Sequence, residues 1–196
     1  MRITRFTTAA AITLALASAV ATAGQAAAGT AAGSAAEFRA QSLAAGLSSA
    51  QSRALQSDVD ARLAQEGGTQ TAANEITLAN GTEILLVLPG ETYARDLDAP
   101  AQRTAGSLAA PSSCGSYTFC AYRGSNFTGD VKRQKLCSET IDVSSWTGTG
   151  SWSNNQSSGT RARMYGSSGE LRYTTPGAYS EDRSGSWNTI FKIDAC

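Results

Sequence analysis

All four cysteines of this chain lie in its last 83 residues, at Cys114, Cys120, Cys137 and Cys196. An even number of cysteines at wide spacing predicts two disulfide bonds, whereas a zinc site needs paired short spacings that the last two do not supply. The sequence leaves all three pairings of the four cysteines open. Disulfides form in oxidising compartments, so the cysteines constrain both the fold of this part and the location of the protein.

The N-terminus has the features of an export signal. Arg2 and Arg5 precede an apolar run that continues to about residue 20, and small residues follow at Ala23 and Ala28. The run is too short to remain as a membrane-spanning helix. We therefore predict a signal peptide over residues 1–28, a secreted, extracellular protein, and no membrane association after cleavage.

Two segments of the chain lack the composition of a packed core. Residues 29–46 are rich in Ala, Gly and Ser and predict a flexible lead-in. Residues 93–113 contain Pro100, Pro111 and many small side chains, which indicates a linker open to proteolysis.

Residues 47–92, between these segments, predict a helix followed by a β-hairpin. Ser48 and Gln51 have the spacing of a capping box, and Gly67 marks the end of the helix. Asn80-Gly81 between two apolar runs predicts a type I′ turn. One helix and two strands bury little apolar surface, so this region either docks on the C-terminal part or acts as a pro-segment.

Residues 114–196 differ in composition from the rest of the chain. They hold eleven of its fourteen aromatic residues, within short β-type runs separated by Gly, Ser and Asn. This pattern predicts a mainly β protein with a compact sandwich at the C-terminus, preceded by the helix-plus-hairpin region. The expected strands are residues 117–123, 131–136, 161–165, 170–173 and 189–193.

Charge and composition exclude several functions. Sixteen basic residues balance sixteen acidic ones, and removal of the signal peptide leaves the chain two charges negative, so we expect no nucleic-acid partner. The densest basic cluster, Lys132, Arg133 and Lys135, predicts a solvated strand face. The chain has no histidine, the usual general base of hydrolases, and its acid pairs do not converge on a substrate, so we predict that it is not an enzyme. We expect a monomer.

One stretch resembles the Greek-key signature of βγ-crystallins. Tyr122, Phe127 and Gly129 have the spacing of a folded hairpin that stacks two aromatic rings and turns at a glycine. The Asn/Ser-rich residues 153–158 look like the loop that ends such a unit. Together with the export signal, the stretch resembles the microbial crystallin-like peptidase inhibitors. This resemblance implies a βγ-crystallin-like domain over residues 114–196 and a secreted protease, in the first place a metalloproteinase, as partner.

An inhibitor of this kind presents a pre-organised loop to the protease. In the resembled family a cysteine-pinned loop in the second half is thought to serve this purpose, and no cysteine stands there before Cys196. The candidate loop in this chain has a tryptophan at each end, and these large apolar groups could enter a protease pocket. Alternatively, the two tryptophans pack in the sandwich core. The loop comprises Trp146, Thr147, Gly148, Thr149, Gly150, Ser151 and Trp152.

Two other functions remain open. Oxygen atoms of Asn154, Asn155 and Ser158 could form a weak calcium site in a structural crystallin-like module, although the same residues also suit a turn whose side chains bind the backbone. No cofactor is required in either case. Crystallin-like killer toxins share the architecture, so a secreted antimicrobial protein is the third candidate, and the near-neutral charge argues mildly against it.

Overall fold

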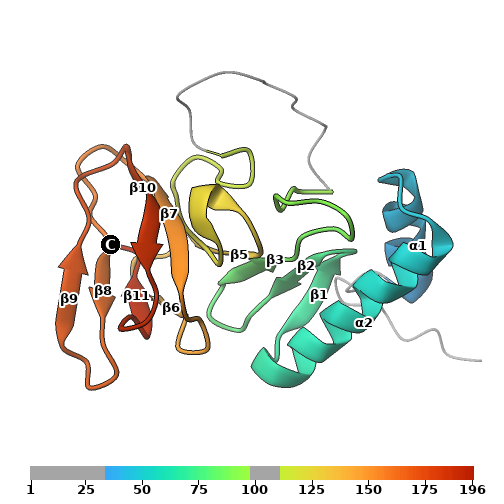
Figure 1. The fold of residues 1–196 in the computed structure, drawn as a ribbon, viewed down its shortest axis with the longest axis horizontal. Helices are drawn as coiled ribbons and strands as arrows, with labels where there is room; N and C mark the ends of the chain where they lie inside the picture. Colours follow the sequence, from blue (N-terminus) through green and yellow to red (C-terminus); the bar gives the residue numbers. More distant parts are fainter. Residues whose placement is uncertain (1–33, 98–110) are drawn as a thin grey trace, which may run out of the picture. The chain divides into compact units, whose positions relative to one another are not determined.

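The structure is a computed structural model that describes residues 34–97 and 111–196. The predicted signal peptide and the middle of the predicted linker lie outside these residues. Within these residues the protein is mainly β, with two antiparallel sheets and two α-helices near the N-terminal side (Figure 1). Neither helix of the described ranges combines the length and the apolar character that a membrane crossing requires.

Helix α1 (Ala35–Ala44) occupies most of the segment predicted as a flexible lead-in, so that prediction is wrong for these residues. Ser34 and Glu37 form a capping box that starts the helix, and Phe38 is buried against α2 and the neighbouring strands. Helix α2 (Ser49–Glu66) is confirmed: Ser48 and Gln51 form the predicted capping box, and the backbone turns away at Gly67 with a φ of 75°.

The larger sheet has seven strands in the order β1-β2-β3-β5-β4-β7-β10. Three come from the helix-plus-hairpin region: β1 (Thr69–Ala72), β2 (Glu75–Thr77) and β3 (Glu83–Leu85). Four come from the C-terminal part: β4 (Thr118–Tyr122), β5 (Val131–Gln134), β7 (Thr149–Asn155) and β10 (Ser180–Ser186). Because β3 pairs with β5, the hairpin extends the C-terminal sheet.

The smaller sheet has four strands in the order β6-β11-β8-β9. They are β6 (Thr140–Asp142), β11 (Lys192–Asp194), β8 (Arg163–Tyr165) and β9 (Leu171–Thr174). Phe119 and Trp152 of the larger sheet pack with Ile141, Met164 and Ile193 of the smaller one. This aromatic-rich core joins the two sheets.

A second core lies under the helices. Leu55 and Val59 of α2 pack on Ile76 and Ile84 of the hairpin. The turn between β2 and β3 is not the predicted type I′ turn, because only Gly81 has a positive φ, of 77°, and the Leu78 N–H bonds the Thr82 carbonyl. Instead, a three-residue loop with one left-handed glycine connects the two strands of the hairpin.

Candidate functional site

The predicted Greek-key residues form a folded turn between β4 and β5. The rings of Tyr122 and Phe127 meet edge to face with centroids 5.2 Å apart, and Gly129 has a φ of 80°. The one-turn helix η1 (Ser125–Phe127) lies in this turn, where Asn126 and Phe127 also have positive φ. The three predicted residues are thus close together in space.

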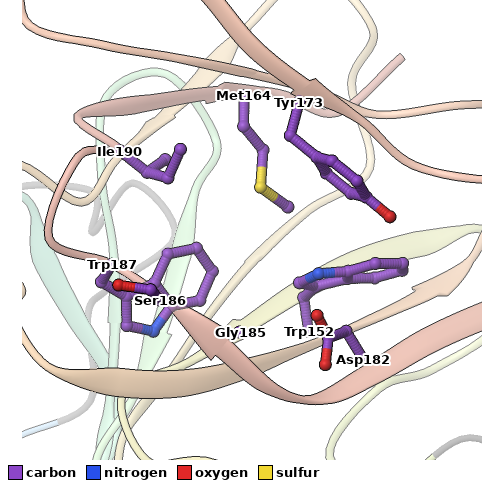
Figure 2. Close-up of a pocket in the computed structure, with 8 residues that line it drawn as sticks. All are labelled: Trp152, Met164, Tyr173, Asp182, Gly185, Ser186, Trp187 and Ile190. Atoms are coloured by element: carbon purple, nitrogen blue, oxygen red, sulfur yellow. The ribbon is translucent and has the colours of Figure 1, made fainter.

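The predicted Trp146–Trp152 loop lies mostly inside the protein. Trp146 is 1% exposed and Trp152 is 3% exposed, and both belong to the core between the sheets. Residues 150–152 lie within β7, a strand hydrogen-bonded on both sides, and are buried, whereas residues 147–149 are exposed. Trp152 instead lines a cavity of about 190 Å³ at the β9 and β10 edges of the sandwich (Figure 2).

The residues of the candidate calcium site have other partners. The Asn154 side-chain amide donates to the Thr160 carbonyl at 2.9 Å. The Asn155 amide donates to the carbonyls of Cys114 and Gly115, both at 3.0 Å. Neighbouring residues of a strand point to opposite faces, so the two amides do not converge. Ser158 lies beyond the end of β7, and calcium binding stays a prediction.

The cysteines pair as Cys114–Cys120 and Cys137–Cys196. Two disulfides were predicted, and the structure selects one of the three pairings. The second bridge joins the end of the chain to the segment before β6, across 59 residues. The first joins two cysteines only six residues apart, of which Cys114 precedes β4 and Cys120 lies within it.

This short disulfide loop, residues 114–120, presents Tyr117 to solvent. Tyr117 is 69% exposed and has a φ of 62°. The backbone around it is held by other groups. Its N–H donates to the Asn155 carbonyl at 2.8 Å, and the Thr118 hydroxyl donates to the Ser116 carbonyl at 3.1 Å. With the two amide contacts of Asn155, the carbonyls of residues 114–116 all have partners, so the backbone of the loop is held in place while the phenol ring is exposed.

A second exposed tyrosine lies at the same end of the sheet. Tyr179 is 44% exposed and directly precedes β10, whose Ser180 pairs with Asn154, while Thr118 pairs with Asn155. Burial, together with its hydrogen bond to the Glu181 carboxylate, raises the pKa of Tyr179 to about 12. Tyr117 and Tyr179 therefore flank the end of β7.

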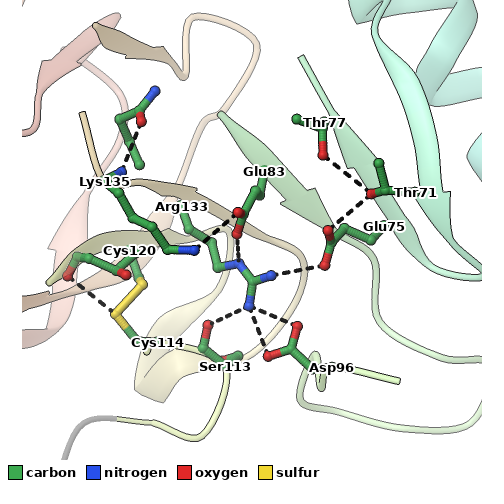
Figure 3. A network of polar contacts seen from close by, with 12 residues as sticks. Thr71, Glu75, Thr77, Glu83, Asp96, Ser113, Cys114, Cys120, Arg133 and Lys135 are labelled. Carbon is green, nitrogen blue, oxygen red and sulfur yellow. Dashed lines mark hydrogen bonds and ion pairs between the residues drawn. A yellow bond between two sulfur atoms is a disulfide. The ribbon is translucent and has the colours of Figure 1, made fainter. Parts of the chain in front are cut away.

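A network of ion pairs around Arg133 contacts the segment that leads into loop 114–120 (Figure 3). The Arg133 guanidinium contacts the carboxylates of Glu75, Glu83 and Asp96, each at 2.8–2.9 Å, and donates to the carbonyl of Ser113 at 3.2 Å. Ser113 directly precedes Cys114 and its hydroxyl lies 3.1 Å from the Tyr122 hydroxyl. The network thus ties the start of the disulfide loop to β2, β3 and β5.

The prediction that Lys132, Arg133 and Lys135 form a solvated basic strand face is wrong for the first two residues. Lys132 is 2% exposed and Arg133 is 8% exposed, and only Lys135 of the cluster lies at the surface. Lys132 pairs with Glu66 at the end of α2 and donates to the Asp142 carbonyl of β6 at 2.8 Å. Buried cations require partners, and the preceding helix and hairpin supply the carboxylates.

Sequence reasoning did not identify Tyr117. Its signal was the sequence Gly-Ser-Tyr-Thr-Phe between Cys114 and Cys120, which makes a short covalent loop with an exposed aromatic residue once these two cysteines are paired. Fold and site together define a mainly β, disulfide-bonded protein with a rigid, tyrosine-bearing surface loop. No protein-family model, curated protein or solved structure matches the chain.

Proposed function

We propose that this protein is a secreted peptidase inhibitor that binds its target through the disulfide loop 114–120, with metalloproteinases as the first class to test. We further propose that the C-terminal part is a βγ-crystallin-like Greek-key module. The Tyr122–Phe127 contact and the left-handed Gly129 support this assignment. The two disulfides support export, because such bonds persist in oxidising compartments.

The observation that carries the proposal is an exposed tyrosine on an immobilised backbone. Tyrosine is enriched among the residues that dominate protein interfaces, because its ring buries a large area at a small cost in side-chain entropy. A disulfide and four hydrogen bonds already order loop 114–120, so binding would lose little further entropy.

The conformation of Tyr117 also favours inhibition over cleavage. Proteases bind their substrates as extended strands, and a residue with a φ of 62° departs from that geometry. The loop would have to unfold before its peptide bonds could be cut, and the bridge between Cys114 and Cys120 opposes that opening.

The test is inhibition of a thermolysin-like metallopeptidase, with subtilisin for comparison, by residues 29–196. We expect Tyr117→Asn to raise the inhibition constant about 30-fold or more, the effect of losing a dominant interface residue of about 2 kcal/mol. Asparagine tolerates positive φ, so the variant removes the ring without straining the backbone.

The matched control is Tyr93→Asn, because Tyr93 is 56% exposed and is bridged to Gly129, in the turn that follows β4, whereas Tyr117 directly precedes β4. This variant should inhibit like the unchanged protein. Absence of inhibition of both peptidases at micromolar protein, or equal loss in the two variants, would contradict the proposal.

A further inference from the structure

The walls of the cavity at the sandwich edge are mostly aromatic and apolar. The indoles of Trp152 and Trp187, the phenol of Tyr173 and the thioether of Met164 surround about 190 Å³ of space. In Figure 2 the Met164 side chain points into this space, between Trp187 and Tyr173. The volume is below that of pockets for drug-sized ligands, so it suits a ligand of a few heavy atoms.

The aromatic walls are fixed in place before any ligand binds. Trp187 donates its indole N–H to the Tyr122 carbonyl at 2.8 Å. A Cβ at Gly150 would overlap this indole, so the glycine in β7 makes room for it. Trp152 stacks on Phe119 with ring centroids 6.1 Å apart and meets Tyr173 at the same distance. The cavity is therefore pre-formed.

One carboxylate, that of Asp182, lines the cavity. Asp182 pairs with Trp152 across the β10–β7 ladder, and the register of that ladder shifts between Asp182 and Gly185. Such bulges redirect side chains and often lie next to binding sites. Within the described residues, the Asp182 carboxylate accepts one hydrogen bond, from the Ser184 N–H at 2.8 Å.

No cation of the described residues pairs with Asp182. The adjacent Arg183 instead binds Glu181 at 2.7 Å and lies over the Phe127 ring, 4.7 Å from its centroid. A carboxylate beside aromatic faces, without a cation of its own, creates a negative potential in a largely apolar cavity.

We propose that this cavity binds a small organic cation of the alkylammonium class, with its methyl groups against Trp152 and Trp187 and its charge near Asp182. Aromatic rings attract quaternary ammonium groups through their negative faces, and the carboxylate adds a full charge. This site is separate from loop 114–120, so it does not depend on the proposed inhibition.

The test is a titration of residues 29–196 with choline chloride, followed by tryptophan fluorescence at constant ionic strength. Two of the three tryptophans line the cavity, so binding should produce a saturable change with a Kd on the order of millimolar. The neutral isostere 3,3-dimethyl-1-butanol should bind about tenfold more weakly, because it keeps the shape and lacks the charge.

Two variants locate the site. Asp182→Asn keeps an acceptor for the Ser184 N–H and removes the charge, so we expect it to raise the Kd for choline about fivefold or more. Tyr173→Ala removes a half-exposed wall and should do the same. Glu139→Gln removes one negative charge outside the cavity and should leave the Kd within about twofold. Melting curves of each variant establish that it is folded.

Co-sedimentation with phosphatidylcholine vesicles distinguishes a free ion from a lipid headgroup. Binding of choline alone assigns a free ammonium ligand, and vesicle binding that choline reverses assigns the headgroup. The proposal is overturned if choline produces no saturable change up to about 100 mM, if the neutral alcohol binds equally well, or if Asp182→Asn binds choline like the unchanged protein.

Discussion

The region of residues 34–97 and the region of residues 111–196 are stabilised by different side chains. The first packs aliphatic residues such as Leu55 and Ile76 under its helices, whereas the second packs three tryptophans and Phe119 between two sheets. Where the two regions meet, charged contacts accompany a small apolar cluster. Lys132 and Arg133 of β5 are buried against carboxylates from α2, β2, β3 and Asp96.

The charged contacts explain how residues 34–97, with their two helices and the hairpin, are held against residues 111–196. Apolar contacts are tolerant of small shifts, whereas buried ion pairs fix the register of the pairing between β3 and β5, since any displacement leaves a charge without a partner. The helix-plus-hairpin region therefore completes the C-terminal sheet both by backbone hydrogen bonds and by neutralising its buried cations.

The largest expected effect is that of removing residues 34–97. Residues 111–196 alone would expose β5 as an edge strand and leave the buried cations Lys132 and Arg133 without their carboxylates. We expect the fragment to lose cooperative unfolding, as measured by thermal denaturation followed by near-UV circular dichroism. A fragment that melts as cooperatively as residues 29–196 would show that the two regions are independent, as a removable pro-segment requires.

A smaller effect is expected from breaking the ion network alone. Arg133→Met should lower the free energy of unfolding by about 3–5 kcal/mol, because it leaves the carboxylates of Glu75 and Asp96 without a cation and Glu83 with the exposed Lys135 alone. Lys135→Met is the matched control on the same segment. Lys135 pairs with Glu83 from an exposed position, so its loss should cost less than about 1 kcal/mol. Urea denaturation measures both, and equal costs would contradict the assignment.

The smallest expected effect concerns pH. Tyr122 lies where the regions share a cluster with Leu85 and Ala94, and its burial raises the pKa of its hydroxyl above the usual 10. The folded protein keeps this proton when the unfolded chain loses it, so the stabilisation is complete below pH 10 and declines as the pH rises further. In Tyr122→Phe the decline of the melting temperature above pH 10 should be shallower; an unchanged decline would assign it to other groups.

Local signals in the sequence were sufficient for part of the fold. The capping box of α2, the hairpin around Gly81 and the strands β4, β5, β8 and β9 were predicted close to their observed positions, whereas the strand predicted over residues 189–193 overlaps β11 only at its end. The signals for these elements are local, because caps, turn glycines and runs of β-branched or aromatic residues favour a helix end, a turn or a strand through contacts within a few residues. The signal peptide and the peptidase-inhibitor function stay predictions.

The sequence did not indicate the two longest strands of the C-terminal part. β7 reads Thr-Gly-Ser-Trp-Ser-Asn-Asn and β10 reads Ser-Glu-Asp-Arg-Ser-Gly-Ser, compositions typical of loops. They are strands because β4 offers β7 a full set of backbone partners, and β7 then does the same for β10. For the same reason the Trp146–Trp152 segment, predicted as a surface loop, lies mostly in the core.

What the sequence alone determined, then, is the mainly β class, the presence of two disulfides and the helix with its ends, since each depends on residue type and short spacing. Only the tertiary structure decided the cysteine pairing, the exposure of Tyr117, the burial of Lys132 and Arg133, and the placing of Asp182 beside two indoles. The physical reason is common to all four: each depends on contacts between residues far apart in the chain, whose energies arise only when strand pairing brings them together.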